Sequence, residues 1–567
     1  MDREYEKKCF ELAHYIFPDV SETVDDLEIR YKERNLKEDA CVTRFAPSPT
    51  GFLHTGALFT TLVNKLLAAQ SGGVSYLRIE DTDSKREVKG SIKLFTEELN
   101  KFGLAPAEGV ISETEEVGDY GPYKQSLRKE LYRICAKHLV EKGLAYPCFC
   151  TQEMIDTTRK SQEANKVVPG YYGIYAKCRN ISIDEAIERV KAGEEYILRF
   201  RSQGSHLNKT SFIDGGRGKI ELAENDQDIV LIKKDGLPTY HFAHVVDDHF
   251  MHTTHVVRGE EWIPSTPIHL DLANAMGFKA PTYVHVPLIM VKDGASKRKL
   301  SKRKDKEAAV SYFLKAGYDK EAMLEYLMTL VNSDFESWRA KNKDADIFDF
   351  KFKIDKMSSS GSLLDIPKLN DISKEIIAKM DSKTVIVKLL AWAEEYDKEF
   401  YDRLLSDIEY TKKVFALERD GAKKVRKDIY KWEDIKDTFF YFWSDLYEED
   451  VKNQGYVFDY NLEEGNKNIT KEVVNKALKL YINKYDESLD KDEWFNSLKE
   501  CASQLGFCPD MKEYKQNKEA YIGSVADFAG IVRVGVTNRK NTPDIYSIMQ
   551  IIGKEEVINR LNNAIIK

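Results

Sequence analysis

The chain has 567 residues, of which 42% are hydrophobic and 32% charged, so its composition excludes a disordered protein and its length predicts several globular domains. Its formal net charge of -8 argues against indiscriminate nucleic-acid binding, which usually requires a basic excess. The eight cysteines are too sparse for a secreted disulfide scaffold, and neither a signal peptide nor about 18 uninterrupted apolar residues is found, so we expect a cytoplasmic protein without a membrane segment.

The first elements along the chain predict a parallel α/β fold. Residues 1–40 are highly charged and have the pattern of a helical N-terminal extension. A strand-like run at 41–46 leads through the breaker cluster PSPTG into helical apolar spacing from His54, and a second strand-like run follows at 74–79. This is a βαβ unit. Because its crossover is right-handed, we expect a Rossmann-like, doubly wound parallel sheet.

The rest of the chain predicts an insertion and a helical C-terminal half. Short mixed segments with a cysteine-rich portion separate the βαβ unit from further strand-like runs at 228–234, 254–260 and 283–291, and the pattern beyond Ser301 is largely helical. The expected domains are an extension (1–40), two halves of one α/β domain (41–120 and 228–300), an insertion (121–227) and two helical regions (301–385 and 386–567). The aromatic run at 438–447 has helical spacing, so we expect it in a core rather than stacked on bases.

The turn PSPTGFLHTG follows the first strand and precedes a helix, which is where an α/β sheet binds ligands. The helix N-terminus offers free N–H groups and partial positive charge, which favours phosphate. Gly51 and Gly56 remove side chains where a nucleotide would approach the backbone, and His54 can donate a hydrogen bond to a phosphoryl oxygen. Taken singly, a histidine beside a glycine turn is more often structural.

A second motif lies in the basic run from Lys292 to Lys306, whose ordinary interpretation is a solvated loop. Within it, Lys299-Leu300-Ser301-Lys302-Arg303 places two lysines three positions apart. Such a pair can hold point charges on the phosphates of a triphosphate while pyrophosphate is displaced. His54, Lys299 and Lys302 are therefore candidate catalytic residues.

The two motifs together resemble the HIGH and KMSKS signatures of class I aminoacyl-tRNA synthetases, and longer strings resemble the glutamyl-tRNA synthetase family. These strings are RFAPSPTGFLHTG (44–56), LRIEDTD (77–83), VVDDH (245–249) and RGEEWIPSTPIH (258–269). The resemblance implies activation of L-glutamate by ATP with Mg²⁺ and transfer to the 3′-terminal adenosine of tRNA(Glu), by a monomer. It also implies that the insertion binds the acceptor stem, that 301–385 contacts the stem, and that 386–567 binds the anticodon.

The resemblance also implies roles for individual residues. Recognition of the glutamate γ-carboxylate needs a bidentate cation, which matches Arg44. The other matches for glutamate are Ser48, Glu80, Tyr240 and Arg258, and those for ATP are Gly51, His54, Gly56, Glu261, Trp262, Lys299 and Lys302. One position departs from the family: many members have Asn where this chain has His244. We expect His244 to line the glutamate pocket.

Two groups of residues suggest metal sites. Five histidines between His241 and His255 lie near Asp247 and Asp248, but in the family this segment belongs to the fold and does not chelate metal. In the insertion, Cys148-Phe149-Cys150 and the later Cys178 resemble a structural zinc site found in some members, which uses a tyrosine as well. Tyr175 is the expected fourth ligand, although Tyr171 and Tyr172 are also nearby in the sequence; buried thiols without metal are the alternative.

Three other functions share part of this sequence pattern. A glutaminyl-charging relative typically has a different form of the A-P-S-P-T-G motif and a β-barrel anticodon module. A tRNA-modifying paralogue is usually truncated after the catalytic domain. A non-catalytic RNA-binding protein on this fold would be expected to lack His54 or Lys302, and both are present. Whether tRNA(Gln) is also charged stays open.

Overall fold

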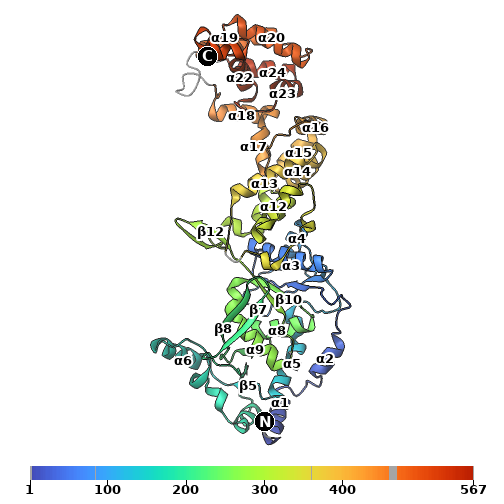
Figure 1. Cartoon of the computed structure of the whole chain (residues 1–567), viewed down its shortest axis with the longest axis vertical. Helices are drawn as coiled ribbons and strands as arrows, with labels where there is room; N and C mark the ends of the chain where they lie inside the picture. The colour runs from blue at the N-terminus through green and yellow to red at the C-terminus, as the bar shows by residue number, and fades with distance from the viewer. Residues whose placement is uncertain (1–2, 84, 359–360, 459–468, 566–567) are drawn as a thin grey trace. The chain divides into compact units, whose positions relative to one another are not determined.

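The computed structural model describes residues 3–83, 85–358, 361–458 and 469–565 (Figure 1). The chain forms two compact units. Unit 1 consists of Met1–Phe313 and Met323–Ile366, and unit 2 of Leu314–Ala322 and Pro367–Lys567. Within the described residues, no helix is both long and apolar enough to cross a bilayer.

Unit 1 is built on the predicted βαβ unit. Strands β1 (Val42–Phe45), β2 (Val74–Leu77) and β3 (Glu108–Val110) run parallel, and β4 (Glu116–Val117) is antiparallel to β3. Helix α3 (Thr55–Ser71) connects β1 to β2 and ends at Gly72, whose φ of 70° favours glycine. A Cβ on Gly73 would lie 2.1 Å from the Cys41 carbonyl oxygen, so this close approach requires glycine.

The second half of the sheet lies on the other side of β1. Strand β10 (His255–Gly259) is parallel to β11 (Thr282–Val286), and the Val42 amide donates to Thr254 Oγ1 at 2.8 Å, which brings β10 beside β1. The helices of this half are α8 (Tyr240–Phe250) and α9 (Thr266–Met276), while α4 (Ser91–Lys101) follows β2. The doubly wound, Rossmann-like fold is thereby confirmed.

The clustered histidines are divided between elements: His241, His244 and His249 lie on helix α8, and His255 begins β10. One local expectation was wrong in this half. The run at 283–291 is split at Pro287 into β11 and β12 (Ile289–Asp293), because proline has no N–H to continue a ladder. Strand β12 pairs instead with β13 (Ser296–Lys299) and with β14 (Ser362–Leu363).

The insertion forms its own antiparallel sheet of β5 (Ala145–Cys148), β6 (Ile197–Phe200) and β9 (Val230–Ile232). Because β9 pairs with β6, the strand expected at 228–234 belongs to the insertion and not to the catalytic sheet. Strands β7 (Lys209–Asp214) and β8 (Gly218–Ala223) form a hairpin. The helices of the insertion are α5 (Lys129–Glu141), α6 (Gln152–Ala164) and α7 (Ile183–Lys191).

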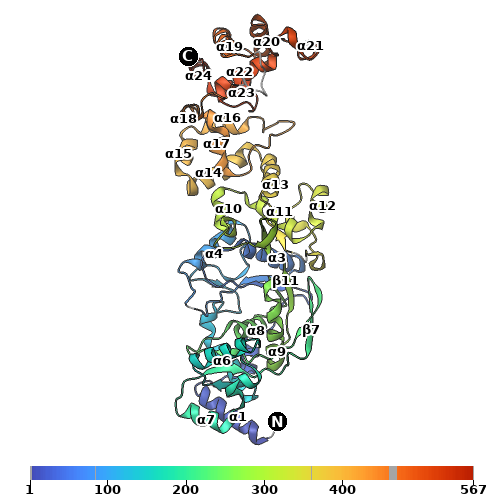
Figure 2. The ribbon, with the colours of Figure 1, turned by 90° about the vertical axis from the view of Figure 1, so that its left-hand side faces the viewer.

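The N-terminal extension consists of α1 (Arg3–Ile16) and α2 (Val24–Arg30), as its composition predicts. Helix α1 packs on α5 and α7, and Figure 2 shows α1 beside α7. Helix α2 is held by His249 of α8, whose Nε2 lies 2.6 Å from Glu28. The extension therefore covers both the insertion and the catalytic half.

Helices α10 (Val310–Ala316) and α11 (Lys320–Val331) each contribute residues to both units, and α12 (Asp334–Lys341) belongs to unit 1. The described part of unit 2 is otherwise helical. Its helices are α13 (Ile366–Lys379), α14 (Ser382–Tyr396), α15 (Lys398–Ser406), α16 (Ile408–Ala416), α17 (Ile435–Phe439), α18 (Ser444–Gln454), α19 (Lys471–Lys484), α20 (Lys491–Gln504), α21 (Met511–Gln516), α22 (Val525–Thr537), α23 (Ile545–Ile552) and α24 (Lys554–Asn563). The aromatic residues Phe439–Trp443 are buried in its core, as the helical spacing predicted.

Candidate active site

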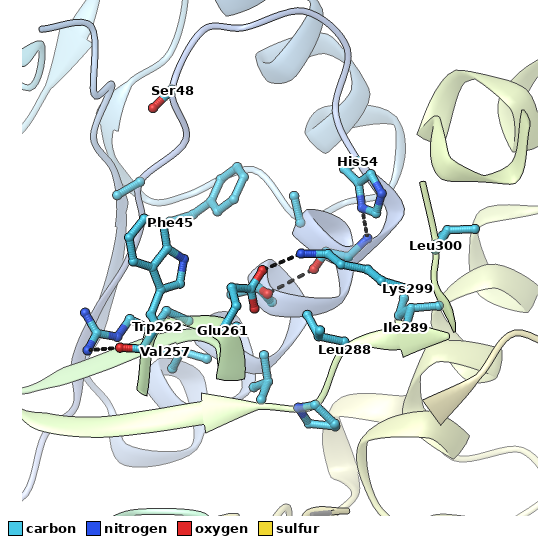
Figure 3. Close-up of a pocket in the computed structure, with 18 of the residues that line it drawn as sticks. Phe45, Ser48, His54, Val257, Glu261, Trp262, Leu288, Ile289, Lys299 and Leu300 are labelled. Carbon is cyan, nitrogen blue, oxygen red and sulfur yellow. Dashed lines mark hydrogen bonds and ion pairs between the residues drawn. The ribbon is translucent and has the colours of Figure 1, made fainter. Parts of the chain in front are cut away.

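A cavity of about 720 Å³ opens at the carboxyl ends of β1, β2, β10 and β11, the edge where α/β sheets bind ligands. Most predicted site residues line it (Figure 3). They are Arg44, Ser48, His54, Gly56, Glu80, Tyr240, Arg258, Glu261, Trp262, Lys299 and Lys302. Gly51 and His244 are not part of its lining. We call the part formed by Arg44, Glu80, Tyr240 and Arg258 the buried end, and the part formed by His54, Glu261, Lys299 and Lys302 the open end.

Arg44 lies on β1 and is 4% exposed. Its Nε lies 3.3 Å from Asp248 Oδ1 and its Nη1 donates to the Val257 carbonyl at 3.2 Å. No hydrogen bond of its Nη2 occurs among the described residues, so this nitrogen remains for a ligand on the cavity wall. Burial alone would raise the pKa of Asp248, but Arg78 and Arg44 hold it below its ordinary value. Arg44 is thus fixed through its Nε and Nη1 atoms.

Glu80 follows β2 and lines the same end. Arg78, fully buried, donates to Glu80 Oε1 at 3.2 Å and to Asp248 Oδ1 at 2.7 Å. Burial raises the pKa of Glu80 despite the nearby Arg78 and Arg44. An ammonium group placed beside Glu80 would favour its ionised form.

Arg258 lies on β10 and is 5% exposed. It donates four hydrogen bonds, all to neutral acceptors: His285 Nε2 (3.0 Å), His269 Nδ1 (3.1 Å), the Trp262 carbonyl (3.3 Å) and Thr266 Oγ1 (2.8 Å). Within the described residues no carboxylate pairs with it. A buried cation without a counter-ion is costly, so this wall of the cavity favours an anionic ligand.

His244 is not part of the cavity lining, so its predicted contact with glutamate stays a prediction. It is 1% exposed and packs between Tyr240 and His269, with ring centroids 5.8 and 4.3 Å away. Burial first, and Arg258 and Arg44 next, hold its pKa well below the ordinary value, so it adds no charge to the site. The wall in front of it is formed by Tyr240, whose ring lies 4.7 Å from that of Trp262.

At the open end, His54 is the N-cap of α3. Its Nδ1 accepts from the Gly56 amide at 2.9 Å, so the proton of the neutral ring is on Nε2. Burial, then the charges of Lys302 and Lys299, lower its pKa to about 4, against a backbone hydrogen bond at Leu300. Near neutral pH His54 is therefore a neutral N–H donor.

The two lysines of the second motif have different partners. Lys299 ends β13, and its Nζ lies 2.7 Å from Glu261 Oε1, as Figure 3 shows. Lys302 donates to the Phe52 carbonyl at 3.3 Å, next to His54, and burial lowers its pKa. Lys302 therefore contacts the turn that carries His54, whereas Lys299 contacts Glu261.

The two signature segments are also tied together by hydrogen bonds to backbone carbonyls. Thr55 Oγ1 donates to the Glu307 carbonyl at 2.6 Å, and the Val310 amide donates to the Leu53 carbonyl at 3.0 Å. Arg298 makes two hydrogen bonds of 2.7 Å to Asp305, which closes the loop between them. Motifs far apart in the sequence thus form one rim.

In the insertion, the sulfurs of Cys148, Cys150 and Cys178 lie within 4.8 Å of one another. The Tyr171 hydroxyl is 3.3 Å from both Cys148 Sγ and Cys150 Sγ. The tyrosine beside the thiols is therefore Tyr171 and not the expected Tyr175, whose ring packs against Tyr172 with the centroids 6.1 Å apart. Hydrogen bonds from Cys150 and Cys178 hold the pKa of Cys148 below its ordinary value.

Two of the three thiols have the spacing of ligands in a tetrahedral zinc site. Zn–S bonds of about 2.3 Å place sulfurs about 3.8 Å apart in a tetrahedron, and Cys150 and Cys178 are 3.6 Å apart. By contrast, the histidines at 241–255 diverge. His249 pairs with Glu28, and His252 Nε2 lies 2.8 Å from the Tyr31 carbonyl. Among the described residues, the three cysteines are the only group of histidine, cysteine and acidic residues with convergent ligand atoms.

Several residues that shape the cavity were missed from the sequence. They are Arg78, Asp214, Asp248, His269 and His285. Arg78 and Asp248 stand inside the quoted strings LRIEDTD and VVDDH, which was the available signal. His285 and Asp214 carry no local signal, because only the contact between β11 and the β7–β8 hairpin brings them together.

Comparison with known proteins agrees with this geometry. The family model for the catalytic domain of class I tRNA synthetases (E and Q) matches residues 40–371, and the model for an anticodon binding domain matches residues 385–565. The chain is 48% identical over 550 residues to "Glutamate--tRNA ligase" of Clostridium perfringens (strain 13 / Type A), covering 97% of this chain and 99% of that protein. It is 42% identical over 555 residues to that of Acetivibrio thermocellus, covering 98% and 99%.

Among solved structures, a glutamate tRNA ligase from Elizabethkingia meningosepticum in complex with its amino acid is similar, with a TM-score of 0.70 and 28% identity. A glutamate-tRNA synthetase from Elizabethkingia anophelis gives a TM-score of 0.71, also at 28% identity. Each comparison covers 93% of this chain and 99% of the other.

Proposed function

The chain belongs to the glutamate–tRNA ligases of the class I tRNA synthetases, so it activates L-glutamate with ATP and charges tRNA, and we propose how its residues divide that work. The buried end binds glutamate and the open end aligns the phosphates of ATP. The observation that carries this division is that two buried arginines and two lysines line one cavity.

Glutamate presents two carboxylates and an ammonium group. Arg44, with its free Nη2, binds the γ-carboxylate; Arg258 faces the other carboxylate; and Glu80 receives the ammonium. Ser48 and Tyr240 complete the wall. A buried guanidinium at the γ position also discriminates against glutamine, because the neutral amide of glutamine gives no ionic attraction to Arg44 and only one hydrogen-bond acceptor in place of two.

Adenylation needs no protein base, because the α-carboxylate of glutamate is already a nucleophile. It attacks the α-phosphorus of ATP as the bond to pyrophosphate breaks, and a hydroxyl of the tRNA 3′-terminal adenosine then takes the glutamyl group and releases AMP. His54 Nε2–H, Lys299 and Lys302 stabilise the charge on the phosphates. Glu261 and Trp262 lie against the base, and Gly51 and Gly56 shape the turn.

Enzymes of this class bind ATP together with Mg²⁺. The lining of the cavity contains only two carboxylates, Glu80 and Glu261, paired with Arg78 and Lys299. This fits an ion that arrives on the substrate phosphates and needs no protein cage.

The tRNA specificity within this function is tested by charging transcripts. Purified protein, ATP and glutamate are mixed with tRNA(Glu) or tRNA(Gln) transcript. A discriminating enzyme charges only tRNA(Glu), whereas charging of both identifies a non-discriminating one. Sedimentation of the same sample tests the predicted monomer.

The cysteine cluster is proposed as a structural zinc site with Cys148, Cys150, Cys178 and Tyr171 as ligands. Its support is the spacing of the sulfurs and the position of the Tyr171 hydroxyl. Metal analysis of purified protein should give about one zinc per chain, and Cys178→Ser should remove it. Cys508→Ser, which changes a buried cysteine of unit 2, is the control. Absence of stoichiometric zinc from the unaltered protein would reject the proposal.

A further inference from the structure

Arg258 is held by two imidazole rings. Because an arginine side chain only donates hydrogen bonds, both ring nitrogens that face it must be unprotonated acceptors. These are Nε2 of His285 at 3.0 Å and Nδ1 of His269 at 3.1 Å. The tautomer of each histidine is therefore determined by Arg258.

On the His285 side, the remaining ring proton is on Nδ1, and it is donated to Asp214 Oδ2 at 2.6 Å. The same carboxylate oxygen accepts the backbone amide of His285 at 3.2 Å. His285 is fully buried, and burial lowers its pKa, which agrees with a neutral ring. Asp214, His285 and Arg258 thus form a linear chain of hydrogen bonds.

Asp214 is itself fixed by the turn of the β7–β8 hairpin. Its Oδ1 accepts the amides of Gly216 and Arg217, both at 2.9 Å, and the next residue, Gly215, donates to the Tyr283 carbonyl of β11 at 2.8 Å. The carboxylate is therefore rigid before any ligand binds. Its hairpin belongs to the insertion, while His285 and Arg258 belong to the catalytic sheet.

On the opposite side, the Nε2 proton of His269 faces His241 Nδ1 at 3.0 Å. The Tyr283 ring covers one face of the guanidinium, with its centroid 4.5 Å from Arg258 Cζ. Arg258 is thus fixed from both sides and on one face. The nearest charge to which it is linked, Asp214, is separated from it by one imidazole ring.

We propose that Asp214 and His285 are positioning residues for Arg258. The pair holds the ring of His285 as an acceptor, which orients the guanidinium, and it keeps the balancing carboxylate one ring away, so that the positive charge stays available to a carboxylate of glutamate. A carboxylate in direct contact with Arg258 would occupy the hydrogen bond that the substrate needs. The proposal rests on the glutamate-binding role of Arg258 given above.

The test compares four variants in aminoacylation of tRNA(Glu) transcript. In Asp214→Asn, the amide can donate to His285, which permits the tautomer that turns Nε2–H toward Arg258. In His285→Leu the acceptor is lost, and in His285→Gln an amide oxygen can replace it. His249→Gln, which changes a histidine paired with Glu28, is the matched control.

We expect Asp214→Asn and His285→Leu to raise the glutamate KM about 10-fold or more, with the ATP KM within about 2-fold. His285→Gln should recover most of this loss, and His249→Gln should not change KM. Equal changes in both KM values, or no recovery by His285→Gln, would mean that the pair only supports the fold, and would overturn the proposal. If His285→Leu does not fold, the isosteric Asp214→Asn decides.

One further variant separates this proposal from the proposed function. Arg258→Lys keeps the positive charge but loses the planar set of N–H donors of the guanidinium. It should therefore raise the glutamate KM at least as much as Asp214→Asn. If Arg258→Lys leaves the glutamate KM unchanged, the role of Arg258 itself is wrong. If Arg258→Lys raises it and Asp214→Asn does not, only the positioning role is wrong.

Discussion

At the buried end of the cavity, Arg44 and Arg258 are 4% and 5% exposed, and each is held by several protein partners. At the open end, the side chain of Lys299 is 52% exposed, and within the described part of the chain it forms an ion pair with Glu261. The arginines are positioned before a ligand arrives, whereas the lysines hold interactions that must be exchanged for phosphates. Within one cavity, therefore, the amino acid is recognised by arginines that are already fixed, and the reaction is stabilised by lysines that exchange their partners for phosphates.

Each type of side chain suits the group that it binds. A planar guanidinium reads a carboxylate only at a defined angle, so its neighbours must fix it. Phosphate charge moves during displacement of pyrophosphate, and a lysine on a flexible stem can follow it. The buried end should therefore respond to mutation mainly in KM, and the open end mainly in kcat.

The largest expected effect is at the open end. Lys302→Ala should lower kcat for adenylation by about 100- to 1000-fold, because a charge that stabilises the transition state is lost, while the glutamate KM changes little. The readout is ATP–pyrophosphate exchange with tRNA present. Lys304→Ala, in the same loop and outside the cavity lining, is the control. An increase in KM without a loss of kcat would remove the contrast between the two ends.

At the buried end, Arg44→Lys should raise the glutamate KM by about 30-fold, because the charge remains and the bidentate geometry is lost. The kcat at saturating glutamate should stay within about 3-fold of the unaltered enzyme. Thermal unfolding of the variant checks that the buried Asp248 carboxylate is still balanced by cations and that the fold is retained. A selective loss of kcat would place Arg44 with the lysines instead.

Beneath the turn that carries His54 lies a buried acid, Glu98 of α4. Burial raises its pKa to about 7, although the backbone of Leu53 lowers it. The folded state then binds the proton more tightly than the unfolded state, so the free energy of unfolding falls as pH rises from about 4.5 to 7. Above about pH 7, Glu98 is ionised in both states, and the loss of stability reaches its full value.

Glu98→Gln should therefore raise the free energy of unfolding at pH 8 by roughly 2 kcal/mol, after an allowance for solvent screening. At pH 4.5 the variant and the unaltered protein should be nearly equal. Urea unfolding at both pH values provides the measurement. The same gain at both pH values would show that the Glu98 carboxyl does not titrate between about pH 4.5 and pH 8, and that its ionisation does not lower the free energy of unfolding.

A smaller effect is expected from Glu261→Gln, which releases Lys299 from its ion pair. Such an exposed pair contributes at most about 1 kcal/mol, so the ATP KM should change by less than about 5-fold, in either direction. The change should shrink at high salt. A large effect that does not depend on salt would mean that the open end is as fixed as the buried end.

The smallest effect is expected from His244→Asn, which introduces the residue found in many family members. Because His244 lies behind Tyr240 and does not line the cavity, the glutamate KM should change by less than about 3-fold. A change of 10-fold or more would support the sequence prediction that His244 contacts glutamate.

The fold was predictable from local patterns, and about half of the cavity lining from the two motifs and the family resemblance. Strand β1, the breaker turn, helix α3 and the αL glycine at its end are each encoded by neighbouring residues. The two signature motifs predicted the open end for the same reason, since their residues lie in short, contiguous segments. The family models agree with this interpretation over residues 40–371 and 385–565.

What the sequence by itself determined is thus the set of elements and the chemistry that each motif can offer. Only the tertiary structure decided that Tyr171, not Tyr175, lies beside the thiols, that β9 pairs within the insertion, and that His244 is buried. It also decided the chain from Asp214 through His285 to Arg258, three residues on different strands. The physical reason is that the direction of a side chain depends on which strand or helix packs against its own, and that contact joins residues whose sequence neighbours carry no trace of it.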